Sequence, residues 1–358
     1  MKIILATGGT AGHVFPALLV ARRLASLGHE AIFVGALSKS LERIRGNGYE
    51  VVNLDARGLT FQSAGGIFLS GALMARALVR SLKILRKLAP DAVCGFGGYG
   101  AFAVGIAAVI LRIPTMIHEQ NVVPGRANKL LAGLVRKVAV SFRKTEKSFE
   151  PSKTVWTGCP CRDLNVAASR ETLLREFGLS VGKFTILALG GSQGSYRINE
   201  SLIGAAQLLK NNLDFQIIHL AGVNDVDSVA ECYKGVRIPF RAFGFLEEME
   251  KAYAVADVVV GRSGAMTVTE IAHSHLPAVL IPYPYAGGHQ KANARILEDL
   301  GGARVLEEKD LTPQSLNEAI LSWNKNPLDK RSLETRLPQE FVADSTGRLT
   351  EEILRLKS

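Results

Sequence analysis

The sequence predicts an α/β protein of two doubly wound, Rossmann-like domains, each a parallel sheet covered by helices. Three observations support this class. With 358 residues, 47% of them hydrophobic, the chain is long enough for two buried cores. Apolar runs of strand length alternate with longer helix-like segments, which is typical of a parallel sheet with helices on both faces. The plan of strand, glycine turn and helix then starts again at residues 184–210.

In the first half, helix-like segments lie between the strand-like runs, one at residues 14–28 and a long one that ends at Leu88. These runs are KIILAT (2–7), EAIFVG (30–35), DAVCGFGG (91–98), TMIHE (115–119) and 154–157. The second half offers FTILAL (184–189), FQIIHLAG (215–222), ADVVVG (256–261) and PAVLIPY (277–283). Gly158 and Pro160 interrupt the pattern, so we expect the join there. The expected domains are 1–161 plus 341–358, with the C-terminal helix returning to the first domain, and 162–340.

Two open sheets of this kind bind ligands beyond the carboxyl ends of their strands. If the two domains face each other, the glycine turns would line one interdomain cleft. Three turns qualify: Gly8–Gly12, Gly95–Gly100 and Gly190–Gly194. A turn without side chains lets a ligand touch the backbone, and the following helix start offers free N–H donors, which together suit a phosphate. Tight turns or close helix packing alone would also explain the glycines.

Composition and motif spacing exclude several classes. The longest apolar stretch, Ala101–Leu111, is well short of the roughly 20 residues that span a bilayer, and the N-terminus lacks a signal-peptide pattern. We therefore expect a cytoplasmic chain without a transmembrane helix. The four cysteines are interpreted as reduced and structural. GGTAGH does not fit the dinucleotide fingerprint G-x-G-x-x-G, and no turn ends in the G-K-[ST] of a P-loop, which disfavours hydride transfer and triphosphate hydrolysis.

Residues 262–293 hold most of the polar detail of the second half. Thr267 and Glu270 lie three apart at a predicted helix start, so Glu270 could complete a capping box or could accept hydrogen bonds from ribose hydroxyls. Gln290 and Asn293 share one helix face after a Gly-Gly turn, where their amides could bind sugar hydroxyls, although such residues are common on helix surfaces.

Five motifs, in order along nearly the whole chain, resemble the GT-B glycosyltransferases. Within them the match is close to the peptidoglycan N-acetylglucosaminyltransferases that make lipid II. The motifs are GGTAGHVFPAL, GFGGY with HEQN, GGSQGS, RSGAMTVTE and PYPYAGGHQKANA. The resemblance implies transfer of N-acetylglucosamine (GlcNAc) from UDP-GlcNAc to the C4 hydroxyl of the muramoyl sugar in undecaprenyl-pyrophosphoryl-MurNAc-pentapeptide (lipid I), with inversion. A related enzyme acting on another lipid or on a small-molecule acceptor is the alternative.

The resemblance also implies roles for individual residues. In the second domain, Glu270 would bind the ribose and Leu246 the uracil, while Arg162 and Ser192 would bind the donor diphosphate. The diphosphate would face the helix start formed by Ala265, Met266, Thr267, Val268 and Thr269, and Gln290 with Asn293 would hold the GlcNAc hydroxyls. In the first domain, Thr10, Ala11, Gly12 and Asn121 would meet the donor sugar and the incoming acceptor, and Tyr99 of the GFGGY motif would meet the acceptor.

An inverting transfer needs a base near the attacking hydroxyl and stabilisation of the departing diphosphate. His13 is our candidate base, with Glu119 as its competitor; a purely hydrogen-bonding role for His13 is the alternative. No paired carboxylates mark a metal–diphosphate site, so no metal and no other cofactor is expected.

The basic charge is confined to one half. Residues 1–161 carry +13 and the remainder −3, against a total of +10. Arg76, Arg80, Lys83 and Lys87 follow one stripe of a predicted helix beside apolar residues, which fits either a solvated helix face or a surface lying on anionic lipid. Nucleic acid is disfavoured because aromatic and zinc-finger patterns are missing. We expect peripheral attachment at the cytoplasmic face of the cell membrane, with UDP-GlcNAc, lipid I and other cell-wall enzymes as partners.

Overall fold

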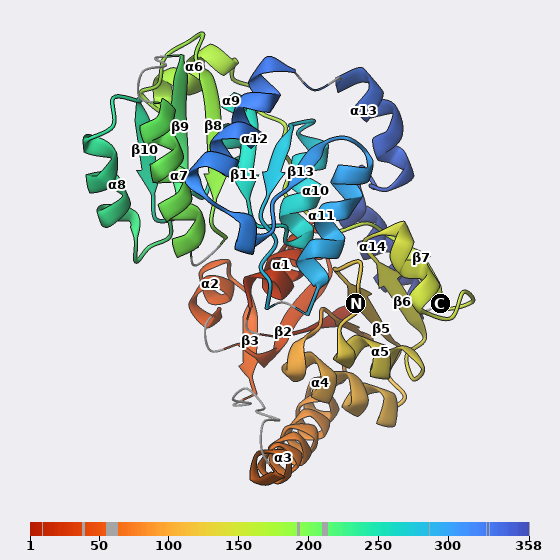
Figure 1. The fold of residues 1–358 in the computed structure, drawn as a ribbon. Helices are drawn as coiled ribbons and strands as arrows, with labels where there is room; N and C mark the ends of the chain where they lie inside the picture. The colour runs from red at the N-terminus through yellow and green to blue at the C-terminus, as the bar shows by residue number, and fades with distance from the viewer. Residues whose placement is uncertain are drawn as a thin grey trace. The chain divides into compact units, whose positions relative to one another are not determined.

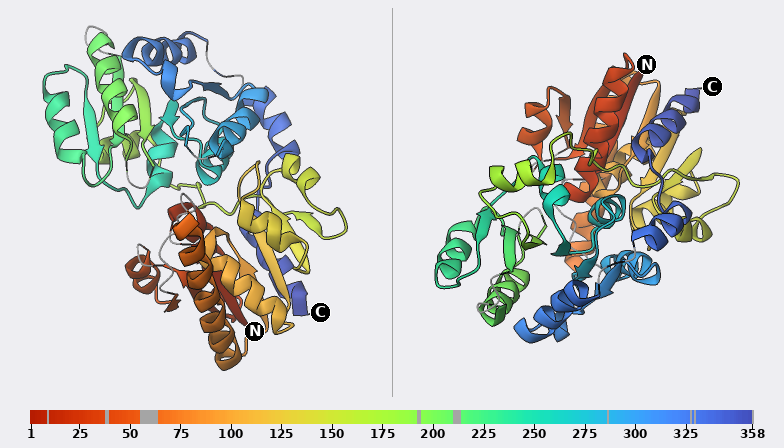
Figure 2. Two further views of the ribbon diagram at one scale, coloured as in Figure 1. Left: turned by 60° about the horizontal axis from the view of Figure 1, so that its bottom comes forward. Right: turned by 90° about the horizontal axis from the view of Figure 1, so that it is seen from above.

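The computed structural model divides the chain into two compact units. Unit 1 comprises Met1–Cys161 and Phe341–Ser358, and unit 2 comprises Arg162–Glu340. The structure describes residues 1–8, 10–37, 40–54, 64–191, 194–209, 214–285, 287–326, 328 and 330–357. Figures 1 and 2 show each unit as a sheet with helices packed against it.

Unit 1 alternates strands and helices along its length. Its elements are β1 (Lys2–Gly8), α1 (Ala11–Ser26), β2 (Glu30–Ala36), α2 (Leu41–Gly46), β3 (Glu50–Asn53), α3 (Ala64–Leu88), β4 (Ala92–Gly95), α4 (Gly98–Ile110), β5 (Thr115–Glu119), α5 (Arg126–Ala132), β6 (Lys137–Val140), the 3₁₀ helix η1 (Arg143–Ser148), β7 (Thr154–Trp156), α14 (Ser345–Leu354) and η4 (Arg355–Lys357).

Unit 2 repeats the plan. Its elements are α6 (Arg170–Glu176), β8 (Phe184–Leu189), α7 (Tyr196–Leu209), β9 (Phe215–Leu220), α8 (Val226–Lys234), β10 (Phe240–Phe243), α9 (Met249–Val255), β11 (Val258–Gly261), α10 (Ala265–His273), β12 (Ala278–Leu280), α11 (His289–Asp299), β13 (Ala303–Val305), η2 (Glu308–Asp310), α12 (Pro313–Lys325), α13 (Lys330–Arg336) and η3 (Leu337–Gln339).

Both sheets are parallel and share one strand order. The sheet of unit 1 runs β3-β2-β1-β4-β5-β6-β7, and that of unit 2 runs β10-β9-β8-β11-β12-β13. This is the doubly wound order, in which the chain leaves the centre first to one side and then to the other. The order reverses between β1 and β4 in unit 1, and between β8 and β11 in unit 2, and a doubly wound sheet binds its ligands at that point.

The central strands are apolar runs because helices bury both of their faces. Residues Ile3 to Ala6 of β1 and Ile186 to Ala188 of β8 are fully buried. Helix α1 turns Val14, Ala17 and Ala21 toward the sheet, at the spacing of one helix face. Helix α14, at the C-terminal end of the chain, packs beside α1, so the last residues complete the core of unit 1 (Figure 2).

Two findings bear on membranes and redox chemistry. Among the described residues, no helix is both long and apolar enough to cross a membrane. The four cysteines, Cys94, Cys159, Cys161 and Cys232, are free thiols, and the first two are buried.

Candidate active site

The glycine turn after β1 is closed by a second glycine turn, the one after β4. The Gly8 amide donates to the Gly97 carbonyl at 2.9 Å. A Cβ added to Gly98 would lie 2.8 Å from the Gly8 Cα, and Gly97 and Gly98 have positive φ angles of 92° and 83°. Side chains are therefore missing here because two backbone segments meet at the switch point of unit 1. Gly9, within the first turn, lies outside the described residues.

The His13 imidazole occupies the space that these glycines leave. A Cβ on Gly97 would lie 3.1 Å from its Nε2 atom, and a Cβ on Gly8 would lie 3.4 Å from its Nδ1 atom. The Thr10 Oγ1 atom is 2.8 Å from Nδ1. If Nδ1 carries the proton and donates to Thr10, Nε2 keeps its lone pair. No described residue bonds to Nε2, so this nitrogen is available to a substrate.

The surroundings of His13 keep the imidazole neutral. Burial lowers its pKa from 6.5 to about 4. The ring also belongs to the first turn of α1, where the helix dipole disfavours a positive charge. A neutral imidazole with a free Nε2 atom is able to accept a proton throughout the physiological pH range.

Gly12 differs from the cradle glycines, which we define as Gly8, Gly97 and Gly98. It is exposed in the first turn of α1, and a Cβ built there would meet nothing within 4 Å. Thr10 is the N-cap of this helix but makes no side-chain capping bond. Thr10, the Ala11 backbone and Gly12 thus form an open helix start next to His13, where a ligand could approach the N–H groups.

Glu119 is a structural acceptor, and the structure argues against its candidacy as the base. Its carboxylate is buried at the end of β5 and accepts four hydrogen bonds. Oε1 accepts from the Asn121 amide at 2.9 Å and from the Asn121 Nδ2 atom at 3.4 Å, while Oε2 accepts from the Gly125 amide at 3.0 Å and from the Asn128 Nδ2 atom at 2.8 Å. These donors hold the loop that follows β5 and occupy the lone pairs a base would use.

Two further candidates of unit 1 surround this region. Asn121 is half-buried, and its carbonyl accepts from the Thr145 hydroxyl. Tyr99 is exposed in the first turn of α4, directly after Gly97 and Gly98. Both follow strands that end at the same edge of the sheet as β1, so the fold brings Asn121 and Tyr99 to the carboxyl edge that also carries His13.

At the switch point of unit 2, α10 begins without a side-chain cap. Its N-cap is Gly264, and the first intrahelical bond runs from the Val268 amide to the Gly264 carbonyl. Ala265, Met266 and Thr267 therefore carry amides without an acceptor among the described residues. Thr269 is buried and donates to the Ala265 carbonyl. Three free N–H groups at the positive end of a helix suit a phosphate group.

Glu270 does not complete a capping box, because it lies in the second turn of α10, beyond the capping positions. Its buried carboxylate instead accepts from Arg162 Nε at 2.7 Å and from the Tyr253 hydroxyl at 3.0 Å. Burial raises the pKa of Glu270, against the opposing effect of Arg162. Arg162 also donates to the Glu247 carbonyl at 3.3 Å. Arg162 and Glu270, which were expected to bind different parts of the donor, therefore form an ion pair with each other.

Side chains of helix α11 hold the loop that leads into α10. The Gln290 Oε1 atom accepts from the Tyr283 amide at 2.9 Å and from the Ser263 amide at 3.3 Å, and the Ser263 hydroxyl donates to the Gln290 carbonyl. These two donors fix the orientation of the amide, so the Gln290 Nε2 atom remains a donor for a ligand. Asn293 is fully buried, and its Nδ2 atom donates to the Ser263 carbonyl at 3.2 Å. In this structure the Asn293 amide is thus turned to the loop and away from solvent.

Of the two remaining candidates for donor binding, the structure describes one. Leu246 is half-buried in the loop between β10 and α9. Ser192, in the turn after β8, lies outside the described residues.

Tyr253 and Ser263 form hydrogen bonds with the candidate site residues, and neither was predicted from the sequence. Tyr253 bonds to Glu270 from α9, and Ser263 joins α10 to α11. Ser263 stands inside the RSGAMTVTE motif, so its position was a usable signal. No such signal was present for Tyr253, because an isolated tyrosine on an apolar helix face is normally interpreted as a core residue.

The basic stripe of α3 is solvated. Arg76, Lys83 and Lys87 are exposed and Arg80 is half-buried, whereas Ala77, Ser81 and Leu85 are buried on another face of the helix. Exposed apolar side chains lie on α3 itself and on or near α4 and α5. They are Val79, Ile110, Leu130 and Leu134. The side chains of residues 64–70, at the start of α3, lie outside the described ones.

Comparison with known proteins places this architecture among the glycosyltransferases. The model of the glycosyltransferase family 28 N-terminal domain matches residues 3–140, and that of the C-terminal domain matches residues 185–349. A crystal structure of MurG from Acinetobacter baumannii has a TM-score of 0.76 and 29% sequence identity over 99% of both chains. The prediction of a GT-B protein with two doubly wound domains is confirmed.

Curated relatives define the family further. A protein from Halothermothrix orenii is 38% identical over 332 residues, covering 89% of each chain. One from Thermodesulfovibrio yellowstonii is 35% identical over 366 residues and covers both chains completely. Each is named UDP-N-acetylglucosamine–N-acetylmuramyl-(pentapeptide) pyrophosphoryl-undecaprenol N-acetylglucosamine transferase. The chain belongs to glycosyltransferase family 28.

Proposed function

We propose that the chain transfers GlcNAc from UDP-GlcNAc to the C4 hydroxyl of MurNAc in undecaprenyl-pyrophosphoryl-MurNAc-pentapeptide, forming lipid II with inversion at the sugar. The names of its relatives from H. orenii and T. yellowstonii support this substrate pair. The observation that carries the proposal is the uncapped start of α10, the helix that also carries Glu270, the partner of Arg162. Free amides suit the donor diphosphate, and the remaining carboxylate lone pairs suit two ribose hydroxyls.

We assign the proton-accepting role to unit 1 and the donor-binding role to unit 2. In the reaction, the acceptor oxygen bonds to C1 of GlcNAc while the bond from C1 to the diphosphate oxygen breaks. The hydroxyl proton passes to His13 Nε2, and UDP leaves with the bonding electron pair. The neutral state of His13 supports this step, because a protonated imidazole could not accept the proton. The amides of Ala265, Met266 and Thr267 offset the charge that develops on the diphosphate.

Thr10, Ala11 and Gly12 are assigned to the reacting sugars, together with Asn121. The exposed position of Gly12, with empty space where a side chain would stand, supports a close approach of ligand to this backbone. Tyr99, exposed beside the cradle glycines, is assigned to the acceptor. In unit 2, Gln290 is assigned to the GlcNAc hydroxyls through its Nε2 atom, which has no partner among the described residues. Leu246 is assigned to the uracil and Ser192 to the diphosphate. Arg162 and Asn293, which the resemblance places on the diphosphate and on the GlcNAc hydroxyls, are assigned instead to holding Glu270 and the Ser263 loop, with which they form hydrogen bonds.

A lipid-linked acceptor has to be met at a membrane. We infer that unit 1 attaches peripherally to the cytoplasmic face through the basic stripe of α3. Three of its four cations are exposed, and a cation near anionic headgroups contributes on the order of 1 kcal/mol. The exposed Val79 beside the stripe adds apolar area.

Vesicle sedimentation tests this attachment. Reversing Arg80 and Lys83 to Glu should weaken binding to vesicles with anionic headgroups by about tenfold or more, while the KM for UDP-GlcNAc stays unchanged. Binding of equal strength by the variant would refute the assignment.

A substrate panel tests the reaction itself. The chain is mixed with UDP-GlcNAc, UDP-glucose or UDP-GalNAc and with a short-chain lipid I analogue, a diacylglycerol or a natural-product aglycone. We expect mass spectrometry to show one added N-acetylhexosamine on the lipid I analogue with UDP-GlcNAc. Transfer to the diacylglycerol or the aglycone, with none to the lipid I analogue, would replace this function by that of a related glycosyltransferase.

A further inference from the structure

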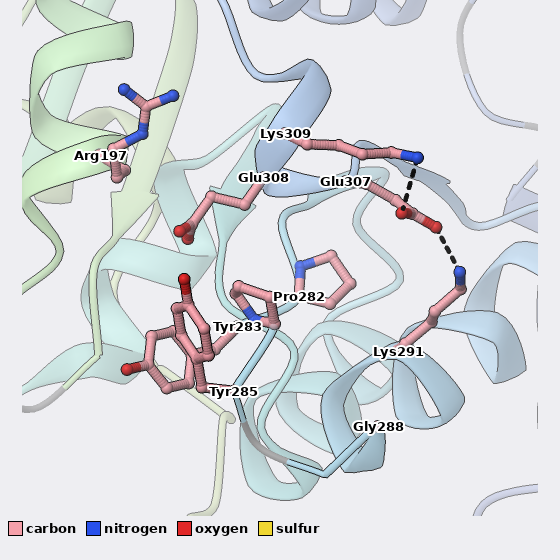
Figure 3. Close-up of a pocket in the computed structure, with 10 residues that line it drawn as sticks. Arg197, Pro282, Tyr283, Tyr285, Gly288, Lys291, Glu307, Glu308 and Lys309 are labelled. Carbon is pink, nitrogen blue, oxygen red and sulfur yellow. Dashed lines mark hydrogen bonds and ion pairs between the residues drawn. The ribbon is translucent and has the colours of Figure 1, made fainter.

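Unit 2 contains a cavity that the donor residues leave unused. It has a volume of about 460 Å³ and opens at the carboxyl ends of β12 and β13 (Figure 3). This size falls within the range of roughly 300–1,000 Å³ found for ligand sites. The walls come from the loop after β12, the start of α11, the segment around η2 and the first turn of α7. Among the lining residues are Arg197, Tyr283, Tyr285, Lys291, Glu307 and Lys309.

Two tyrosines give the cavity an aromatic wall. Tyr283 and Tyr285 are 44% and 82% exposed, and their ring centroids lie 5.5 Å apart in an edge-to-face arrangement. A proline precedes each of them in the sequence, Pro282 and Pro284. Exposed tyrosines on a proline-stiffened loop offer flat contact area at a small entropic cost, which is how protein surfaces commonly bind peptides.

The charges of the cavity favour an anionic ligand. Glu307 contacts both Lys291 and Lys309, as Figure 3 shows, and Glu308 pairs with Arg262 at 2.5 Å. Among the lining residues, the two carboxylates stand against three cations, Arg197, Lys291 and Lys309, which leaves one positive charge in excess. Lys309 is 75% exposed, and the one ion pair it forms with a described residue, Glu307, is long at 3.7 Å, so its ammonium group can turn toward a ligand carboxylate.

The start of α11 adds to this preference. Its N-cap, Gly288, lines the cavity and makes no side-chain capping bond, and the first intrahelical bond is donated by Ala292. The helix therefore begins at the cavity and places the partial positive charge of its N-terminus there.

The cavity also adjoins the residue assigned to the transferred sugar. Gln290 stands between Gly288 and Lys291 on α11, and both of these line the cavity. In a muramyl peptide the peptide is attached through the lactyl group at O3, beside the C4 hydroxyl that attacks GlcNAc. Five extended residues reach about 17 Å, so a peptide starting near the bound sugar can enter the cavity.

We propose that this cavity binds the carboxylate-bearing peptide arm of the acceptor. The inference rests on the proposed function, since it takes the acceptor to be a muramyl pentapeptide. Recognition would come from the tyrosine rings along the peptide and, at its carboxylates, from Lys309, Lys291 and the positive end of the α11 dipole. The peptide would then contribute to acceptor affinity without touching the nucleotide.

The test compares Tyr285→Ala and Lys309→Glu with wild type. Both side chains are largely exposed, so both variants should fold, which thermal melting checks. Lys234→Glu is the matched control, because Lys234 is an equally exposed lysine paired with a neighbouring glutamate on α8. The KM is measured for UDP-GlcNAc and for the lipid I analogue. Soluble MurNAc-pentapeptide and MurNAc-monopeptide are compared as inhibitors competing with the acceptor.

We expect the KM for the lipid I analogue to rise about tenfold in Tyr285→Ala and about fivefold in Lys309→Glu, with the KM for UDP-GlcNAc unchanged. Inhibition by the pentapeptide should weaken in both variants, while inhibition by the monopeptide and all values for Lys234→Glu stay at the wild-type level. Equal effects on the two inhibitors, a changed KM for UDP-GlcNAc, or no preference of wild type for the longer peptide would overturn the proposal.

Failure of the proposed function has a different signature, in which wild type transfers no GlcNAc to the lipid I analogue. Calorimetric binding of the two soluble muramyl peptides to the intact chain then decides the inference without turnover. Tighter binding of the pentapeptide that both variants lose supports the site, and equal binding of the two peptides overturns it.

Discussion

The two units carry the same sheet topology, but their switch points hold different chemistry. In unit 1, three glycines close around an uncharged imidazole whose Nε2 atom has no partner among the described residues. In unit 2, the switch point holds a charged pair, Arg162 with Glu270, and a helix start with free amides. We propose that the first site takes up a proton and that the second holds a charged, hydroxylated ligand.

The comparison also separates two uses of glycine. The cradle glycines are required by contacts within the protein, because a Cβ on any of them would press against backbone or the His13 ring. Gly12 meets nothing, so only a ligand would need its bare backbone. A glycine turn in a sequence therefore does not identify a phosphate site until its neighbours are known.

The largest effect is expected when the proton acceptor proposed for unit 1 is removed. His13→Ala should lower kcat by about 10²- to 10⁴-fold at saturating substrates, because the base is lost, and should leave the KM for UDP-GlcNAc within about twofold. His275→Ala, at a half-exposed histidine of unit 2, is the control. Retention of most of kcat in His13→Ala would reduce His13 to a hydrogen-bonding role.

The next effect addresses the donor site of unit 2. Glu270→Gln removes the charge that Arg162 neutralises and should raise the KM for UDP-GlcNAc by about fiftyfold, with a smaller change in kcat. Glu248→Gln, on an exposed glutamate that pairs with Lys251, should change neither constant. A fall in kcat alone would mean that Glu270 acts in the chemical step and not in binding.

Glu119→Gln distinguishes a structural acceptor from a base. The amide group would turn one N–H₂ toward backbone donors that need an acceptor, so the free energy of unfolding should fall by about 2 kcal/mol in urea denaturation. The kcat per folded molecule and its pH profile should remain those of wild type. A loss of kcat comparable to that of His13→Ala would restore Glu119 as the base.

A pair of glycine variants sharpens the comparison further. Gly97→Ala places a methyl group 3.1 Å from His13 Nε2 at a φ of 92°, and should cost about 1–3 kcal/mol of stability and about tenfold in kcat. Gly12→Ala should fold at least as stably as wild type, since alanine favours helix and the space is empty, yet raise the KM for a substrate by about tenfold. Thermal melting and kinetics on both proteins check this. An unchanged KM in Gly12→Ala would show that no ligand contacts that backbone.

Much of the fold could be predicted from the sequence because the central strands are long apolar runs. The strands that escaped prediction are β3, β6, β10 and β13, of three or four residues each. Three of them form sheet edges, where a strand pairs on one side only and tolerates polar residues such as Glu50 and Arg304. The apolar run that reveals a central strand is therefore absent from them.

The candidate site was predictable as a set of residues but not as a set of bonds. The motifs contain His13, Glu270 and Gln290, yet nothing in the sequence indicates that Gly97, 84 positions away, shapes the His13 site. Likewise Arg162 and Glu270 stand 108 residues apart, and only the fold makes them partners. Glu119 is the opposite case, in which the sequence suggested a role that its contacts do not favour. A carboxylate in a motif suggests a base, but the fold surrounds this one with four hydrogen-bond donors.

A ¹⁵N NMR titration of the His13 ring in the intact chain shows whether the buried imidazole beside the cradle glycines is neutral, with its Nε2 atom unprotonated. Because burial places the pKa of the folded state below the ordinary value of 6.5, the ring should stay neutral from pH 8 down to about pH 5, with the proton on Nδ1, and titrate near pH 4. A titration midpoint near 6.5, or a neutral ring with its proton on Nε2, would contradict the account.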